Sequence, residues 1–157
     1  MAEYRMTTCW RFDAPVERVY EAICEPVRWP NWWRGAQDVV ELNSGDPRGV
    51  GRLLRYTWKG LLPYTLTFTV QVVRVLPLAV LEGVARGDLE GIGRWRFSQE
   101  GSITAVSYEW RVRTTRLWMN VFAPIAGPLF EWNHNVIMRE GGRGLARLLG
   151  ARLLDQQ

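Results

Sequence analysis

The sequence contains very little histidine and cysteine. One histidine (His134) and two cysteines (Cys9 and Cys24) occur in 157 residues. The cysteines form no CxxC pair, and a zinc site needs three or four ligands of these types, so we expect no metal site and no cofactor. The separated cysteines favour two buried free thiols, with a single disulfide as the alternative. One histidine also gives no convincing Ser-His-Asp arrangement, and the glycines of 83–93 lack phosphate-loop spacing.

Long apolar runs are also missing. The longest, Leu117–Phe130, has fourteen residues that include Asn120 and two prolines, so it is too short and too broken to span a bilayer. The first residues show no apolar stretch typical of a signal peptide. We therefore expect a cytoplasmic protein, and its length predicts a single domain over residues 1–157.

The charged residues are basic in balance but scattered. The formal net charge is +4, and Lys59 is the only lysine, so arginine supplies nearly all of the positive charge. No run of like charge occurs, which predicts that nucleic acid is not a partner. The aromatic content is high, with nine Trp, five Tyr and five Phe. Aromatic side chains need a large apolar interior or a ligand surface, so either a bulky core or a binding cavity is expected.

The order of predicted elements is that of an α+β domain. Tyr4–Phe12 reads as a strand, Asp13 as the cap of a helix that begins at Pro15, and Arg28–Arg34 as a second short helical piece. Alternation and turn residues then predict six strands joined by short turns, which must be antiparallel neighbours. These are Val39–Leu42, Gly51–Trp58, Tyr64–Leu76, Val80–Arg86, Leu89–Gln99 and Ile103–Thr115.

A long helix is expected from Pro128 to Leu153. At 100° per residue its charged side and its apolar side separate. The charged side holds Glu131, Asn135, Arg139, Arg143 and Arg147, and the apolar side holds Phe130, Asn133, His134, Ile137, Met138, Gly141, Leu145 and Leu148. An antiparallel sheet with one apolar face needs a cover, and this helix is the element long enough to supply it.

Five segments form a combination that is typical of one superfamily: Ala14–Tyr20, Glu25–Trp33, Gly91–Phe97, Gly101–Val106 and Trp132–Arg139. Together they resemble the START-like (SRPBCC) superfamily, and in particular its bacterial polyketide cyclase-like branch. The resemblance implies a helix-grip fold, in which a curved seven-stranded antiparallel sheet wraps around the C-terminal helix after two short helices. It also implies a cavity between sheet and helix for a lipid, polyketide or aromatic molecule. The superfamily hosts carriers, sensors and enzymes, so the resemblance alone assigns no catalytic residue.

The predicted ligand-binding residues lie on the inner sheet face and on the apolar side of the long helix. They are Trp33, Tyr64, Phe68, Trp95, Phe97, Tyr108, Trp110, Asn133, His134, Ile137 and Met138. His134 is either a structural histidine bonded to a strand carbonyl or to Tyr108, a ligand anchor, or an acid-base group. Glu82 sits in an apolar strand, and we expect it to face outward into solvent rather than inward with a raised pKa.

The segment Leu117–Phe130 has three interpretations. It packs on its own domain, it contacts a membrane surface with help from Arg113 and Arg116, or it joins two copies in a homodimer. For the whole protein we expect a carrier or sensor of a small hydrophobic ligand. The alternatives are a polyketide cyclase- or aromatase-like enzyme and a membrane-associated lipid transfer protein, as a monomer or a homodimer.

Overall fold

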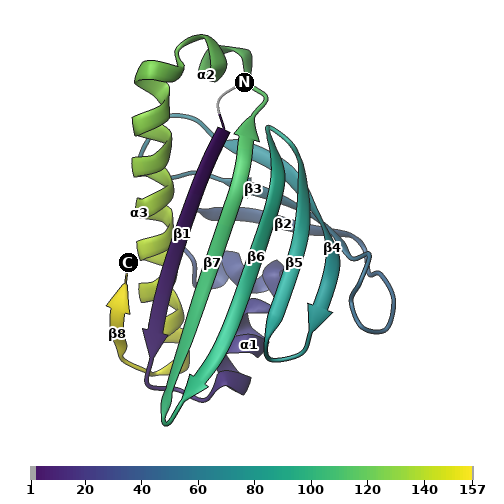
Figure 1. The fold of residues 1–157 in the computed structure, drawn as a ribbon, viewed down its shortest axis with the longest axis vertical. Coiled ribbons are helices and arrows are strands. Elements are labelled where there is room, and N and C mark those ends of the chain that lie inside the picture. The colour runs from purple at the N-terminus through teal and green to yellow at the C-terminus, as the bar shows by residue number, and fades with distance from the viewer. Residues whose placement is uncertain (1–2, 157) are drawn as a thin grey trace.

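The computed structural model describes residues 3–156, whose backbone forms a curved sheet around one long helix (Figure 1). The first half contains β1 (Glu3–Phe12), α1 (Val16–Ile23), η1 (Pro26–Asn31), β2 (Ala36–Asn43), β3 (Leu53–Trp58) and β4 (Leu66–Leu76). The second half contains β5 (Val80–Gly87), β6 (Leu89–Glu100), β7 (Ile103–Thr114), α2 (Leu117–Val121), α3 (Ala123–Leu149) and β8 (Leu153–Gln156). The helix-grip arrangement and the antiparallel sheet expected from the sequence are confirmed.

The sheet follows the order β2-β3-β4-β5-β6-β7-β1-β8. Strands β2 to β7 are sequential antiparallel neighbours, as short turns require. β1 leaves this pattern and pairs with β7, from Glu3 opposite Arg113 to Phe12 opposite Thr104. This pairing places the first strand of the chain near one end of the sheet, between β7 and β8 and beside α3 (Figure 1).

The expected strand number of seven is wrong, since the described residues form eight strands. The long helix ends at Leu149 rather than at Leu153, because Gly150 adopts a left-handed conformation (φ 62°) that closes the helix with hydrogen bonds to Ala146 and Arg147. The chain then turns back, and Leu153–Gln156 adds to the free edge of β1. A four-residue strand carries too little periodicity to be recognised in the sequence.

The start of α1 also differs from the expectation. Asp13 does not cap this helix, and its carboxylate instead accepts hydrogen bonds from the backbone N–H and the guanidinium of Arg152. The first free N–H of the helix, that of Val16, donates to the Gln99 side chain at 2.7 Å. A capping group from β6 has replaced the local one, which no local pattern reveals. The helix itself buries Val16, Val19 and Ile23 as its spacing predicts.

The segment 117–130 is helical. α2 covers its first five residues, and α3 begins at Ala123, five residues before the predicted start. Pro124 falls in the first turn of α3, where its missing N–H costs nothing, so only Pro128 removes a helical hydrogen bond. The predicted charged side of α3 is exposed as expected. On the other side, Leu148 is 52% exposed rather than inward, because it lies in the last turn of the helix.

Candidate functional site: an aromatic cavity between sheet and helix

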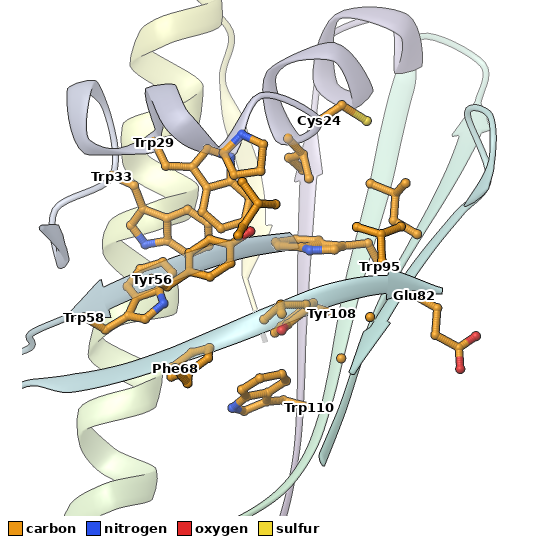
Figure 2. Close-up of a pocket in the computed structure, with 18 of the residues that line it drawn as sticks. Cys24, Trp29, Trp33, Tyr56, Trp58, Phe68, Glu82, Trp95, Tyr108 and Trp110 are labelled. Atoms are coloured by element: carbon orange, nitrogen blue, oxygen red, sulfur yellow. The ribbon is translucent and has the colours of Figure 1, made fainter. Parts of the chain in front are cut away.

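A cavity of about 410 Å³ lies between the inner sheet face, the α1–η1 segment and α3. Figure 2 shows Trp29, Trp33, Tyr56 and Trp58 gathered on one side of it, with Phe68, Trp95, Tyr108 and Trp110 on the strands nearby. The helix α3 contributes Phe130, Asn133, His134, Ile137 and Met138. A volume of this size is within the range of small-molecule pockets, and its wall is mainly aromatic.

The aromatic wall is a connected set of ring contacts. Trp33 lies at its centre, 4.9 Å from Trp29 and 5.0 Å from Trp58 between ring centroids. Trp95 packs on Tyr108 at 4.3 Å. Rings at these separations attract one another in tilted and edge-on geometries, and each fixes the orientation of its neighbour. The wall is therefore a continuous layer of aromatic rings in mutual contact.

A hydrogen bond fixes Trp33 against the helix. Its Nε1–H donates to the carbonyl of Ile137 at 2.9 Å, and its indole ring lies where a Cβ on Gly141 would be. The carbonyl of Trp32 approaches Gly144 so closely that a Cβ there would overlap it. Two glycines one turn apart thus let the tryptophan segment lie directly on α3, and this contact fixes one side of the cavity.

Nine of the eleven predicted ligand-binding residues line the cavity, and two do not. The nine are Trp33, Phe68, Trp95, Tyr108, Trp110, Asn133, His134, Ile137 and Met138. Tyr64 precedes β4, so the alternation of that strand does not orient it, and its ring packs on Trp118 at 5.5 Å. Phe97 faces inward from β6 but lies under α1, where it packs on Tyr20 at 5.0 Å.

His134 brings an unsatisfied polar atom to the cavity wall. Its Nε2 is buried and has no hydrogen-bond partner among residues 3–156, so neither a strand carbonyl nor Tyr108 bonds it. Burial lowers the pKa of His134 to about 4, because the charged imidazolium has lost its hydration without gaining a partner. The imidazole is therefore neutral at neutral pH. A neutral, buried ring nitrogen without a partner is a position at which a ligand group gains a hydrogen bond.

Asn133 has a different role from its neighbour. Its Oδ1 accepts a hydrogen bond from the backbone N–H of Leu61 at 3.0 Å, and Gly60 lies against its amide. The side chain thus holds the β3–β4 loop onto α3 at the edge of the cavity. The loop and the helix are fixed to each other by one buried polar group.

Five aromatic residues of the wall were absent from the predicted set: Tyr20, Trp29, Tyr56, Trp58 and Phe130. Trp29 lines the cavity from η1, and Tyr56 and Trp58 do so from β3. Period-two alternation through Leu54, Tyr56 and Trp58 carried the signal for the last two. The Nε1–H of Trp29 is buried and unpartnered within the described part of the chain. An indole N–H can only donate a hydrogen bond, so an acceptor oxygen on a ligand would satisfy this atom.

Two cavity tyrosines keep their protons. Burial raises the pKa of Tyr56 and of Tyr108 well above the ordinary value near 10. Both hydroxyls are therefore neutral across the physiological pH range and can donate or accept hydrogen bonds. Together with His134 they leave the aromatic part of the cavity without charge, which suits a neutral ligand.

Charged groups border the cavity beside α1. Arg48 and Arg52 lie there with Cys24, whose pKa burial raises, so its thiol stays protonated. Arg52 pairs with Glu41 at 2.6 Å. Glu82 also reaches this border, but its carboxylate pairs with Arg94 at 3.2 Å and is turned away from the aromatic rings (Figure 2).

The two cysteines, Cys9 and Cys24, are half-buried, although the sequence predicted that both are buried.

The described residues hold no group of three or more His, Cys, Asp or Glu side chains that could bind a metal ion. No helix within residues 3–156 is long and apolar enough to cross a membrane.

No family model matches the chain, and no curated protein matches it. Solved structures do resemble it. The di-domain ARO/CYC BexL from the BE-7585A biosynthetic pathway aligns with 96% of this chain and 51% of its own, at 18% identity and a TM-score of 0.74. The chain thus spans about half of that di-domain protein.

Two further structures match over nearly their whole length. The Zhui aromatase/cyclase from Streptomyces sp. R1128 aligns with 95% of this chain and 93% of its own, at 16% identity and a TM-score of 0.69. A START superfamily protein from Mycobacterium smegmatis aligns with 93% and 97%, at 12% identity and a TM-score of 0.75. At these identities the likeness shows the fold, which is START-like.

Proposed function

We propose that this protein binds one small, largely apolar molecule in the aromatic cavity, as a carrier or sensor. The observation that carries the proposal is a continuous aromatic wall with two buried, unpartnered polar atoms, His134 Nε2 and Trp29 Nε1. An apolar ligand body removes the ring faces from water, at roughly 25 cal/mol per Å² of apolar surface. One or two oxygen functions on the ligand satisfy the unpartnered nitrogens. Neutral aromatic compounds that bear a hydroxyl or carbonyl group fit both requirements.

Native mass spectrometry of protein purified from cells is the first test. A bound ligand adds a defined mass that is lost on unfolding. Titration with 1-naphthol then measures the affinity of a neutral aromatic probe. Val70→Trp fills the cavity from β4 and should weaken 1-naphthol binding at least about tenfold. The matched control is Val73→Trp, at an exposed position of the same strand, which should bind as the wild type does.

Leu81→Phe is a milder filling variant at the same cavity, and thermal unfolding reports whether each variant is folded. Folded filling variants that bind 1-naphthol as tightly as the control contradict the proposal. So does a folded wild-type protein with no affinity for any neutral aromatic probe.

The polar anchor can be tested separately with a pair of probes that differ by one hydroxyl, naphthalene and 1-naphthol. The wild type should prefer 1-naphthol by roughly fivefold to a hundredfold, the cost of leaving a buried polar group unpaired. In His134→Phe this preference should largely disappear while naphthalene binding is kept. An unchanged preference removes His134 from the anchor.

A cyclase- or aromatase-like enzyme is the second candidate. The structural likeness to the ARO/CYC BexL and to the Zhui aromatase/cyclase favours it, together with the histidine in the cavity. With a pKa of about 4, His134 is a weak proton acceptor and is not a proton donor at neutral pH. Its contribution would be to orient a reactive chain by hydrogen bonding. If a polyketide chain is turned over, His134→Ala should abolish turnover and leave binding nearly intact. A fully active variant would count against this role.

A further inference from the structure

The wall of the cavity changes in chemistry along β3 and β4. In the register of these strands Tyr56 stands opposite Phe68, and Leu54 stands opposite Val70, two residues further along. The next cavity-lining residue is Arg52, whose carbonyl accepts a hydrogen bond from the N–H of Val72 at 2.9 Å. The wall is therefore aromatic, then aliphatic, then cationic. At about 3.3 Å per residue, the cationic layer lies roughly 13 Å along the strand from Tyr56.

Arg48 also reaches the cationic end of the cavity, from the loop between β2 and β3. Its side chain lines the cavity, is exposed, and makes no ion pair or hydrogen bond with the rest of residues 3–156. The acids nearby are engaged elsewhere, since Glu41 pairs with Arg52 at 2.6 Å and Glu82 pairs with Arg94 at 3.2 Å. The guanidinium of Arg48 is thus available to an acceptor at the cavity border.

The loop that carries Arg48 is held in shape by its own hydrogen bonds. Asp46 Oδ1 accepts from the backbone N–H groups of Arg48 and Val50, at 2.8 and 3.0 Å, and within the described residues it makes no ion pair with the guanidinium. The N–H of Gly51 donates to the carbonyl of Val72 at 2.7 Å, which attaches the loop to β4. Gly51 has a φ of 86°, which a glycine adopts without strain. The loop therefore fixes the position of the arginine relative to the cavity.

We propose that the ligand carries a carboxylate at the end that faces Arg48, joined to its aromatic body by an aliphatic spacer. This inference rests on the proposed function and specifies the ligand class as an arylalkanoic acid. A guanidinium presents parallel N–H donors that match the two oxygens of a carboxylate. One unpaired arginine offsets one negative charge, which fits a singly charged carboxylate better than a doubly charged phosphate. The uncharged body of the ligand lies at the aromatic end, beside His134 and Trp29.

The test compares two probes of the same shape, 5-(1-naphthyl)pentanoate and its primary amide. The wild type should bind the acid about threefold to tenfold more tightly at low salt, and the difference should shrink at high salt. Arg48→Gln should abolish this preference. The matched control is Arg55→Gln, which removes one positive charge from an exposed position of β3 that does not line the cavity, and it should keep the preference.

A shorter pair of probes tests the spacer. 1-Naphthoate carries its carboxylate directly on the ring, so the carboxylate cannot reach Arg48 while the ring occupies the aromatic end. The wild type should therefore show no preference for 1-naphthoate over 1-naphthamide. A preference as large as that of the longer pair overturns the predicted position of the carboxylate.

A wild type that binds the long acid and its amide equally also overturns the inference, as does a preference that Arg48→Gln retains. In either case, 1-naphthol binding that responds to Val70→Trp leaves the proposed function standing. A protein that binds neither 1-naphthol nor the longer probes contradicts the proposed function itself, so the two failures are distinguishable. Thermal unfolding shows whether both arginine variants are folded.

Discussion

The two halves of α3 pack in opposite ways. The half around Gly141 and Gly144 lies directly on Trp32 and Trp33, with no room for even a methyl group. The half from Ala123 to His134 borders a cavity, leaves the His134 Nε2 without a partner among the described residues, and exposes Ile125, Leu129 and Trp132. One helix is thus closely packed in its C-terminal half, whereas its N-terminal half leaves a buried polar atom without a partner and apolar side chains exposed.

The difference distinguishes the part of α3 that stabilises the fold from the part whose groups lack partners. Close packing at the C-terminal half gains dispersion energy and fixes the cavity wall. The unpaired polar atom and the exposed apolar side chains of the N-terminal half lower the stability of the folded state and stabilise no other part of the fold. An unpaired buried polar atom is expected where a ligand supplies the missing contact.

The largest expected effect on stability comes from replacing a glycine by alanine in the C-terminal half of α3, with the same change in the N-terminal half as the comparison. Gly144→Ala places a Cβ against the Trp32 carbonyl, which is backbone and cannot move aside, and should lower the free energy of unfolding by about 4 kcal/mol. Gly127→Ala in the other half meets only the Tyr4 hydroxyl at 3.3 Å and should be neutral or stabilise by up to about 1 kcal/mol through helix propensity. Urea unfolding of both variants measures the difference. Equal losses would show that the two halves are packed alike.

The second effect is a pH dependence that arises from His134. Its folded pKa of about 4 lies below the unfolded value of 6.5, so between these values the unfolded chain binds a proton that the folded protein does not. Stability should be unaffected above pH 6.5 and should fall by about 3 kcal/mol as the pH drops from 6.5 to 4. His134→Phe should lose this part of the acid sensitivity. Parallel pH profiles for wild type and variant would refute the assignment.

The inward face of β7 and the position of His134 were both predicted from the sequence. The alternation through Val106, Tyr108, Trp110 and Val112 placed β7 and its inward face correctly, because one residue type fills each face of a half-buried strand. The same rule put Phe97 inward but could not tell that α1 covers it. His134 was placed on the correct side of the helix, but whether its Nε2 has a partner depends on the fold.

Where two segments distant in sequence meet, the sequence was least informative. Gln99 caps α1, Arg152 takes Asp13, and Leu153–Gln156 extends the sheet beside β1. Each of these is an interaction between segments that are distant in sequence, whereas helix and strand propensities describe only interactions between near neighbours. Trp29 was missed as a cavity residue because η1 has only six residues, and so short a 3₁₀ helix shows no repeating pattern that would indicate a buried face.

A smaller effect is expected at the contact between α3 and the β3–β4 loop. Asn133→Ala leaves the N–H of Leu61 without its acceptor and should destabilise the protein by roughly 1–2 kcal/mol. Asn135→Ala, on the exposed side of the same turn, makes the same change in helix propensity without this loss. The difference between the two variants in thermal unfolding measures what the buried Asn133 side chain contributes, including its hydrogen bond to Leu61. A difference near zero would mean that the loop is held by other contacts.

The smallest effect is expected at the exposed N-terminal end of α3. Ile125→Ser removes an exposed side chain and should change the free energy of unfolding by less than about 0.5 kcal/mol. Leu145→Ala, at a fully buried position of the same helix, should cost about 2–5 kcal/mol. Urea unfolding compares the two. A large loss at Ile125 would mean that this end of α3 is part of the core.

The pairing of β1 with β7 has a consequence for the order of assembly. Residues 3–12 are synthesised well before their partner strand, residues 103–114, so β1 must wait for that strand before it can pair with it. The hairpins from β2 to β7 close over short sequence distances and can form early, whereas contacts of long sequence separation form slowly. The aromatic cavity is lined by strands β3 to β7 and by α3, so it is completed only when α3, which follows β7 in the chain, has packed on the sheet.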